Sequence, residues 1–408
     1  MAKIDQVSPL APAGFPALPQ IGGVRFAAGA AGVRHQGRDD VMLAVMQPGT
    51  AVAGVFTRSA TRSAPVLDCQ AKLGGAADGP AAILVNSGNS NAFTGHYGQV
   101  SVSAITAAVG AATGVAPERV FTASTGVIGE PLPHDRIVAR LDDLNATLGP
   151  DAIEPAARAI MTTDTFAKGA CATLEIDGTP VNIAGIAKGS GMIAPDMATM
   201  LVYIFTDAAH DQAALQALLS KHTDTTFNCI TVDSDTSTSD SLMLAATGAA
   251  GVDATGNPAF EAALHGVMLD LAQQVVRDGE GATKFVEVRV TGAASDSDAK
   301  IHGLSIANSP LVKTAIAGED PNWGRVVMAI GKSGAAADRD LLTIRFGDIL
   351  VAEKGWVSPA YREEDAAAYM KGQDLVIAVD LGLGAGQATV WTCDLTHGYI
   401  SINADYRS

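Results

Sequence analysis

Residues 171–205 read CATLEIDGTPVNIAGIAKGSGMIAPDMATMLVYIF, and this stretch decides which kind of sheet the chain builds. Two strand-like segments flank the Asp-Gly dipeptide at 177–178, which is typical of a tight hairpin turn. A polar loop with two glycines and a proline follows, and positions 197–205 are then almost wholly apolar, with one aliphatic hydroxyl at Thr199. We therefore expect a β-hairpin, a bent loop and a third strand that begins near Thr199.

Strand-like and helix-like segments alternate on both sides of this stretch. We expect further strands at 24–33, 41–49, 51–59, 80–95, 231–248, 285–292, 341–347, 375–382 and 388–395. Helices are expected at 101–114, 134–149, 154–165, 211–227 and 258–279. Neighbouring hairpin-like strands favour an α+β fold over a doubly wound parallel sheet. The length of 408 residues predicts two lobes or one unusually large domain.

Composition and charge exclude several classes of protein. Hydrophobic residues make up 48% of the chain and charged residues 17%, as in a folded globular protein. The formal charge of -16 and the absence of a Lys/Arg cluster argue against nucleic acid and anionic membranes as partners. No segment has the length of a membrane span or the pattern of a secretory signal, so a cytoplasmic location is expected.

Neither a metal site nor a nucleotide loop is predicted. The four cysteines are far apart, and the eight histidines form no pair at helical spacing that would hold a metal. The GLGAG sequence at 382–386 lacks the third glycine of a dinucleotide loop and leads into another strand, so it is interpreted as a hairpin turn.

The single hydroxyl at the start of the strand suggests a catalytic chemistry. A threonine hydroxyl is a poor nucleophile without a base, and its own α-amine supplies one once the residue is a chain terminus. That amine has an unperturbed pKa of about 7.7 to 8.0. Attack of the Thr199 Oγ on the carbonyl of the small residue Ala198, followed by an N-to-O acyl shift and ester hydrolysis, frees it. From this segment alone, packing in an apolar strand is the more ordinary role for Thr199.

Several motifs along the chain favour the catalytic role of Thr199 instead. Together they resemble the ornithine acetyltransferase family, also called the bifunctional glutamate N-acetyltransferase family. The resemblance covers nearly the whole chain, and KGSGMIAPDMATML at 188–201 is similar to the family's self-processing signature. The other motifs are NSGNSNAFTG (86–95), ASTGVIGEPLP (123–133), AIMTTDTFAKGA (159–170), TFNCITVDSDTSTSDS (226–241), DGEGATKFVEV (278–288), NSPLVKTAIAGEDPNWGRVVMAIGK (308–332) and INADYRS (402–408).

The resemblance implies catalytic roles at three positions. Thr199 is the expected nucleophile, and Thr125 and Gly126 are the expected oxyanion hole. A backbone N–H beside an unhindered glycine and a hydroxyl are suitable donors to the negative oxygen of a tetrahedral intermediate. Without the family, the Thr125–Gly126 pair is an ordinary turn.

The resemblance also assigns a substrate site to Thr165, Lys188, Thr199, Glu280, Asn403 and Ser408. A lysine ammonium suits the α-carboxylate of an amino acid, and a glutamate suits an ammonium group. Taken singly, Lys188 is a solvated loop lysine, Thr165 a helix cap and Glu280 a turn residue. The sequence departs from the family pattern at Ser90, Asp196 and Ser408, where alanine, asparagine and threonine are common.

The implied reaction is a ping-pong transfer of acetyl from N-acetylornithine through Thr199 to glutamate, without an organic cofactor or metal and with acetyl-CoA as a further acetyl donor in bifunctional members. Cleavage implies an α chain of 1–198, a β chain of 199–408 and an α2β2 heterotetramer. The implied fold is the α/β sandwich of self-processing aminopeptidases. Two alternatives remain: an amidohydrolase of that fold, in which water discharges the acyl enzyme, and an uncleaved binding protein on the same scaffold.

Overall fold

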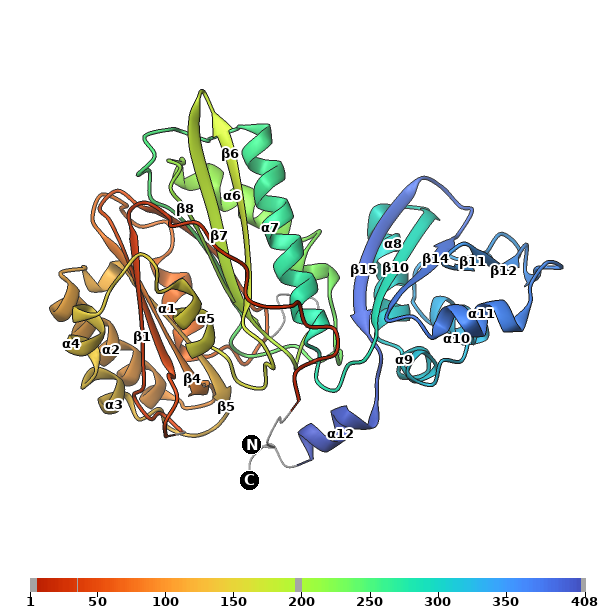
Figure 1. Cartoon of the computed structure of the whole chain (residues 1–408), viewed down its shortest axis with the longest axis horizontal. Helices are drawn as coiled ribbons and strands as arrows, with labels where there is room; N and C mark the ends of the chain where they lie inside the picture. The colour runs from red at the N-terminus through yellow and green to blue at the C-terminus, as the bar shows by residue number, and fades with distance from the viewer. Residues whose placement is uncertain (1–5, 35, 195–199, 405–408) are drawn as a thin grey trace.

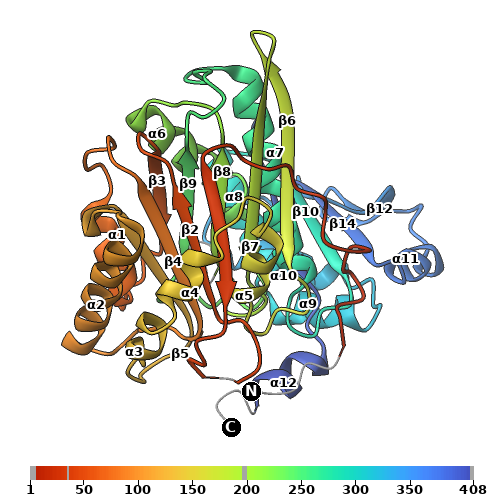
Figure 2. The ribbon, with the colours of Figure 1, turned by 60° about the vertical axis from the view of Figure 1, so that its left-hand side comes forward.

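Two lobes make up the molecule, one from roughly the first two thirds of the chain and one from the last third (Figure 1). The structure is a computed structural model and describes residues 6–34, 36–194 and 200–404. The first lobe contains two stacked sheets with helices on their outer sides, and the second contains one sheet with helices (Figure 2). This arrangement confirms the predicted α+β class.

The first sheet carries one wall of the site described below. Its strands lie in the order β1 (Val24–Gly29), β2 (Val41–Met46), β4 (Ala81–Asn89) and β5 (Val120–Val127). The first three strands pair antiparallel, whereas β4 and β5 are parallel. Every residue of β4 is buried, as its apolar sequence predicts for a strand covered on both faces.

The second sheet contains the hairpin that the Asp177–Gly178 dipeptide predicts. Its order is β3 (Ala51–Phe56), β9 (Ser241–Ala246), β8 (Leu201–Thr206), β7 (Thr179–Lys188) and β6 (Lys168–Ile176). Asp177 and Gly178 join β6 to β7 with positive φ values of 51° and 78°, so the predicted hairpin is confirmed. Strands β8 and β9, which follow the predicted 198/199 division, lie between β3 and β7, which precede it, so the division does not follow the boundary between the lobes.

Strand β8 packs against two different cores because its alternate residues face opposite sides. Leu201, Tyr203 and Phe205 contact the first sheet, and Val202 and Ile204 contact helices. All six residues of β8 are buried. The chain directly after Thr199 is therefore buried between layers of the first lobe. These layers follow one another in the order helix, sheet, sheet, helix.

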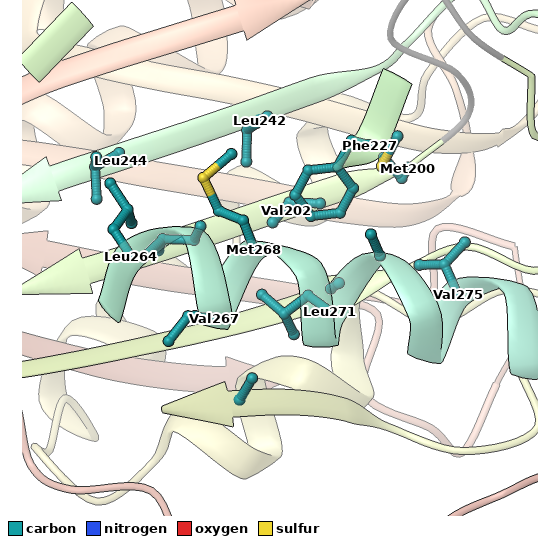
Figure 3. Close-up of a cluster of buried hydrophobic side chains, with 14 of the residues drawn as sticks. Met200, Val202, Phe227, Leu242, Leu244, Leu264, Val267, Met268, Leu271 and Val275 are labelled. Atoms are coloured by element: carbon teal, nitrogen blue, oxygen red, sulfur yellow. The ribbon is translucent and has the colours of Figure 1, made fainter. Parts of the chain in front are cut away.

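Helix α7 (Pro258–Arg277) covers the outer face of the second sheet (Figure 3). It begins at Asn257, whose side chain accepts hydrogen bonds from two backbone N–H groups of the first turn. Leu264, Met268, Leu271 and Val275 recur at helical spacing and are completely buried against that sheet. Each such side chain contributes roughly 1.5–3 kcal/mol of hydrophobic free energy.

Shorter helices complete the first lobe. Helices α2 and α4 pack on the outer face of the first sheet, α1 and α5 contact the core between the two sheets, and α6 lies beside α7 against the second sheet. Their bounds are α1 Ala64–Lys72, α2 His96–Thr113, α3 His134–Val138, α4 Leu141–Ala146, α5 Ile153–Ala159 and α6 Gln212–Thr223, with 3₁₀ turns at Pro117–Arg119 and Phe227–Cys229.

The second lobe is a six-stranded sheet packed against helices. The strand order is β13 (Trp356–Val357), β12 (Ile349–Glu353), β11 (Thr343–Phe346), β14 (Asp374–Asp380), β10 (Phe285–Ala293) and β15 (Gly386–Cys393). The helices are α8 Asp296–Ala307, α9 Pro310–Ala317, α10 Trp323–Gly331, α11 Glu363–Met370 and α12 His397–Asn403.

The interpretation of GLGAG at 382–386 as a hairpin turn is wrong. Strands β14 and β15 are not neighbours, since β10 lies between them and pairs parallel with β14 and antiparallel with β15. The glycines instead carry the chain across the end of β10. A tight turn and a short crossover use the same residue types, and only the long-range pairing distinguishes them.

Candidate active site

A pocket formed by the first lobe and helix α12 brings together five of the residues predicted from the sequence. Its empty space measures about 570 Å³, including its open mouth. The predicted residues on its wall are Thr125, Gly126, Lys188, Glu280 and Asn403. They come from β5, β7, the loop after α7 and helix α12, so segments far apart in the chain meet here.

Thr125 and Gly126 lie near the end of β5, where that strand runs beside β4. In this register Thr125 is opposite Ser87, and Gly126 is opposite Gly88. A Cβ on Gly126 would lie 2.6 Å from the nitrogen of Asn89, and its φ of 131° also favours glycine. The two strands can approach this closely only because position 126 has no side chain.

Lys188 is the last residue of β7, and its side chain is almost completely buried. Its Nζ lies 3.5 Å from the Thr125 hydroxyl oxygen and 3.8 Å from Oδ2 of Asp164. Burial lowers the pKa of Lys188, and the carboxylate of Asp164 opposes that shift. The wall thus carries a cation whose charge is maintained by a neighbouring carboxylate.

Glu280 supplies the opposite charge across the pocket. Burial raises the pKa of its carboxyl group, whereas a hydrogen bond from the amide of Asn403 to Oε2, 2.6 Å long, opposes that shift. A Cβ on Gly191 would lie 2.6 Å from Oε1 of Glu280, so the carboxylate packs directly on the loop backbone. The pocket therefore offers a cation and a carboxylate to a small zwitterion.

Helix α12 is attached to the same region by its own hydrogen bonds. The Thr396 hydroxyl donates to the backbone carbonyl of Gly281 at 2.7 Å, and the Tyr399 hydroxyl donates to Asp233 at 3.2 Å. Asp233 also accepts the backbone N–H groups of Met192 and Ile193. The helix and the loop that follows Lys188 are consequently held by one carboxylate.

The structure does not bring Thr165 to this pocket. The Thr165 hydroxyl donates to Asp278 and accepts the backbone N–H of Ser8 at 2.9 Å. Thr162 and Thr163, from the same TTDT sequence, line the pocket in its place. The backbone bends after α5, so Thr162 and Thr163 face the pocket whereas Thr165 faces Asp278 and Ser8.

Three predicted residues, Ala198, Thr199 and Ser408, lie outside the described residues, as does Asp196. Met200, which follows Thr199 in the sequence, is described, and hydrogen bonds hold its backbone in place. The Met200 N–H donates to Oδ1 of Asp240 at 2.9 Å, and the Met200 carbonyl accepts from the backbone of Ser241. Burial raises the pKa of Asp240 well above its ordinary value.

Several residues of this region were missed by sequence reasoning. They are the wall residues Thr162, Thr163 and Ser237–Ser239, and the buried carboxylates Asp164 and Asp240. The polar sequence TSTSD at 236–240, placed directly before a wholly apolar strand, would have indicated Ser237–Ser239 and Asp240, but not Thr162, Thr163 or Asp164. Ser90 also lines the pocket, but its hydroxyl donates to the backbone carbonyl of Val127 at 2.8 Å.

Two negative findings concern only the part of the chain that the structure describes. No three His, Cys, Asp or Glu side chains there are grouped as metal ligands. None of the described helices combines the length and apolar character needed to cross a membrane.

Comparison with known proteins gives consistent matches over the full length. The sequence pattern of the ArgJ family matches residues 25–408. The chain is 82% identical to the arginine biosynthesis bifunctional protein ArgJ of Ruegeria pomeroyi over 408 residues, which is 100% of both chains. The protein of the same name from Agrobacterium fabrum is 54% identical and is matched over 98% of this chain and 99% of its own.

Two solved structures match about half of the chain. The crystal structure of arginine biosynthesis bifunctional protein ArgJ from Bacillus halodurans is 44% identical, with a TM-score of 0.48, and the match covers 50% of this chain and 97% of that one. Ornithine acetyltransferase from Mycobacterium tuberculosis, solved in complex with ornithine, is 35% identical with a TM-score of 0.38, covering 43% and 92%.

Proposed function

The chain belongs to the ArgJ family and is an acyltransferase of arginine biosynthesis, and we propose that it moves acetyl from N-acetylornithine to glutamate through Thr199. One observation carries the proposal: Lys188, Glu280 and the Thr125–Gly126 pair line a single pocket. A cation, an anion and an oxyanion site are what an acetylated amino acid requires.

The first step of the proposed chemistry is self-cleavage. The Thr199 Oγ attacks the Ala198 carbonyl, the C–N bond breaks as the amide nitrogen takes up a proton, and water hydrolyses the resulting ester. The new α-amine then serves as the base for the same hydroxyl. In the second sheet, β8 and β9 from after this bond are paired between β3 and β7 from before it, which supports two chains that stay folded together after cleavage.

Acetyl transfer would then follow in two half-reactions. The Thr199 Oγ attacks the acetyl carbonyl of N-acetylornithine, the α-nitrogen leaves with a proton as ornithine, and an acetyl ester remains on Thr199. The neutral α-amine of glutamate attacks that ester, and the proton returns to Oγ. Each tetrahedral intermediate carries a negative oxygen, which the Gly126 backbone and the Thr125 hydroxyl are suited to stabilise.

The charged residues of the pocket account for substrate orientation. Lys188 would hold the α-carboxylate that N-acetylornithine and glutamate share, and Glu280 would receive an ammonium group. Thr162 and Thr163 are better placed than Thr165 to add hydroxyl contacts, because they line the pocket. None of these steps calls for a metal or an organic cofactor.

Mass spectrometry tests the cleavage. The wild-type protein is expected to give two fragments that divide at 198/199, and the Thr199→Ala variant one inactive chain. An uncleaved but fully active wild-type protein would overturn the Thr199 chemistry and favour a different nucleophile.

Acetyl-labelled N-acetylornithine and glutamate test the transfer. Label is expected on glutamate, whereas label only in free acetate would support the amidohydrolase alternative. A parallel reaction with acetyl-CoA and glutamate decides whether acetyl-CoA is a second donor. We also propose an α2β2 assembly in the cytoplasm, and native mass spectrometry of the cleaved protein tests the subunit composition.

A further inference from the structure

Asp164 lies behind the pocket wall, and both of its carboxylate oxygens accept hydrogen bonds from groups other than Lys188. Its Oδ1 accepts the Nζ of Lys168 at 2.7 Å and the N–H of Gly189 at 2.6 Å. Its Oδ2 accepts the N–H of Thr162 at 2.9 Å. Burial alone would raise the pKa of Asp164, but the ammonium groups of Lys168 and Lys188 hold it well below its ordinary value, so the group is a carboxylate.

Lys188 is near this carboxylate without being bound closely to it. The distance from Nζ to Oδ2 of Asp164 is 3.8 Å, and the Thr125 hydroxyl is 3.5 Å away. Charge-assisted hydrogen bonds between an ammonium and a carboxylate are typically about 2.7–2.9 Å long. Lys188 therefore receives the charge of Asp164 while its donors remain available on the pocket side.

Lys168 binds the carboxylate of Asp164 in place of Lys188. The Nζ of Lys168 lies between Asp164 and Asp278, at 2.7 Å and 2.5 Å from their carboxylate oxygens, and all three side chains have no exposed surface. Two ammonium groups and two carboxylates form a neutral buried group. Without Lys168, Oδ1 of Asp164 would lose its ammonium donor and the charge of Asp164 would be less compensated. The carboxylate would then attract Lys188 away from the pocket.

We infer that Asp164 is a positioning residue for substrate binding, which keeps Lys188 charged and directed at a substrate carboxylate, while Lys168 prevents the two from forming a closed pair. The inference rests on the proposed function, because it requires a substrate that carries a carboxylate. It adds two residues that do not line the pocket, and Asp164 acts on the substrate through Lys188 and also holds the backbone of the wall residue Thr162.

The inference predicts a specific pH dependence. The charged groups that act on Lys188 are Asp164, Lys168, Glu280 and Asp240, and burial already lowers the pKa of Lys188. Removing the Asp164 charge lowers that pKa further, so Lys188 loses its proton at a lower pH. The alkaline limb of kcat/KM for glutamate should then move to lower pH by about one unit or more, the usual effect of a charge within ~4–6 Å.

The experiment compares Asp164→Asn with Asp278→Asn in the cleaved holoenzyme. Both replacements are isosteric and remove one buried carboxylate beside Lys168, but Asp164 is the charge that acts most strongly on Lys188, and Asp278 is not among the principal ones. In Asp164→Asn we expect the alkaline limb to shift and the KM for glutamate to rise about tenfold, in line with the loss of one charge-assisted contact. The kcat should stay nearly unchanged. The Asp278→Asn limb should move less than the Asp164→Asn limb.

A conservative variant separates charge from packing. Asp164→Glu keeps the charge and should keep the alkaline limb in place even if its KM changes, and thermal unfolding reports on folding in every variant. Equal shifts in the Asp164→Asn and Asp278→Asn variants, or no shift in either, would overturn the inference. A shifted limb in Asp164→Glu would do the same, whereas wild-type protein without acetyl transfer would refute the proposed function instead.

Discussion

Replacement of Lys188 by methionine tests the substrate site most directly. Methionine has a similar length and no charge, so it fills the same buried space while removing the ammonium group. Asp164 keeps its hydrogen bonds from Lys168, Gly189 and Thr162. The carboxylate behind the pocket therefore stays satisfied, and the main loss falls on the bound substrate.

The expected size of the loss follows from the geometry. The Lys188 side chain is only 3% exposed, so a carboxylate bound there is held by a largely desolvated charge. A hydrogen bond to a charged group contributes about 1.5–3 kcal/mol, which corresponds to a roughly 10- to 150-fold increase in KM. The protein should also lose stability, by less than the roughly 3–5 kcal/mol of a broken buried ion pair, because Asp164 keeps three hydrogen-bond donors.

The assay is the initial rate of acetyl transfer as a function of glutamate and N-acetylornithine concentration, with thermal unfolding of the same sample. Lys313→Met is the matched control: Lys313 is also 3% exposed, but it lies in the second lobe and donates to Thr392 at 2.8 Å. It should lower the melting temperature without raising either KM. A Lys188→Met enzyme with wild-type KM values would refute the assignment of Lys188 as the carboxylate site.

Three further predictions concern neighbouring positions. Glu280→Gln removes the anion of the pocket, so KM for N-acetylornithine should rise about tenfold or more in the same rate assay, with a normal melting curve. Gly126→Ala forces a Cβ against the backbone of β4, and we expect kcat to fall by about 10²–10³ through distortion of the oxyanion site; a wild-type kcat would exclude it from that site. Ser90→Ala removes a hydroxyl already committed to a backbone carbonyl, so calorimetry should detect a loss of about 1 kcal/mol in stability while both KM values stay constant.

Local patterns predicted the secondary structure well because neighbouring residues impose it. The Asp177–Gly178 turn adopts the positive φ values that its residue types favour, and the apolar run after position 199 became a strand buried on both faces. The order of strands was not accessible in this way. The GLGAG segment was misread because β10, almost a hundred residues earlier, lies between the strands that it connects.

In the candidate site, too, some residues could be predicted from local sequence and others only from the folded structure. The motifs identified Lys188, Glu280, Thr125, Gly126 and Asn403, and folding brings these into one pocket. They did not distinguish Thr162 from Thr165, because both belong to one short polar segment and only the path of the backbone after α5 decides which hydroxyl faces the pocket.

By itself, the sequence determined the α+β class, the hairpin and the family, since all three are carried by residue types in local order. Only the tertiary structure decided that Asp164 accepts hydrogen bonds from Lys168, Gly189 and Thr162 while Lys188 remains available. The reason is physical: the strength of a buried charge depends on which donors surround it, and those donors meet only when separate segments pack together.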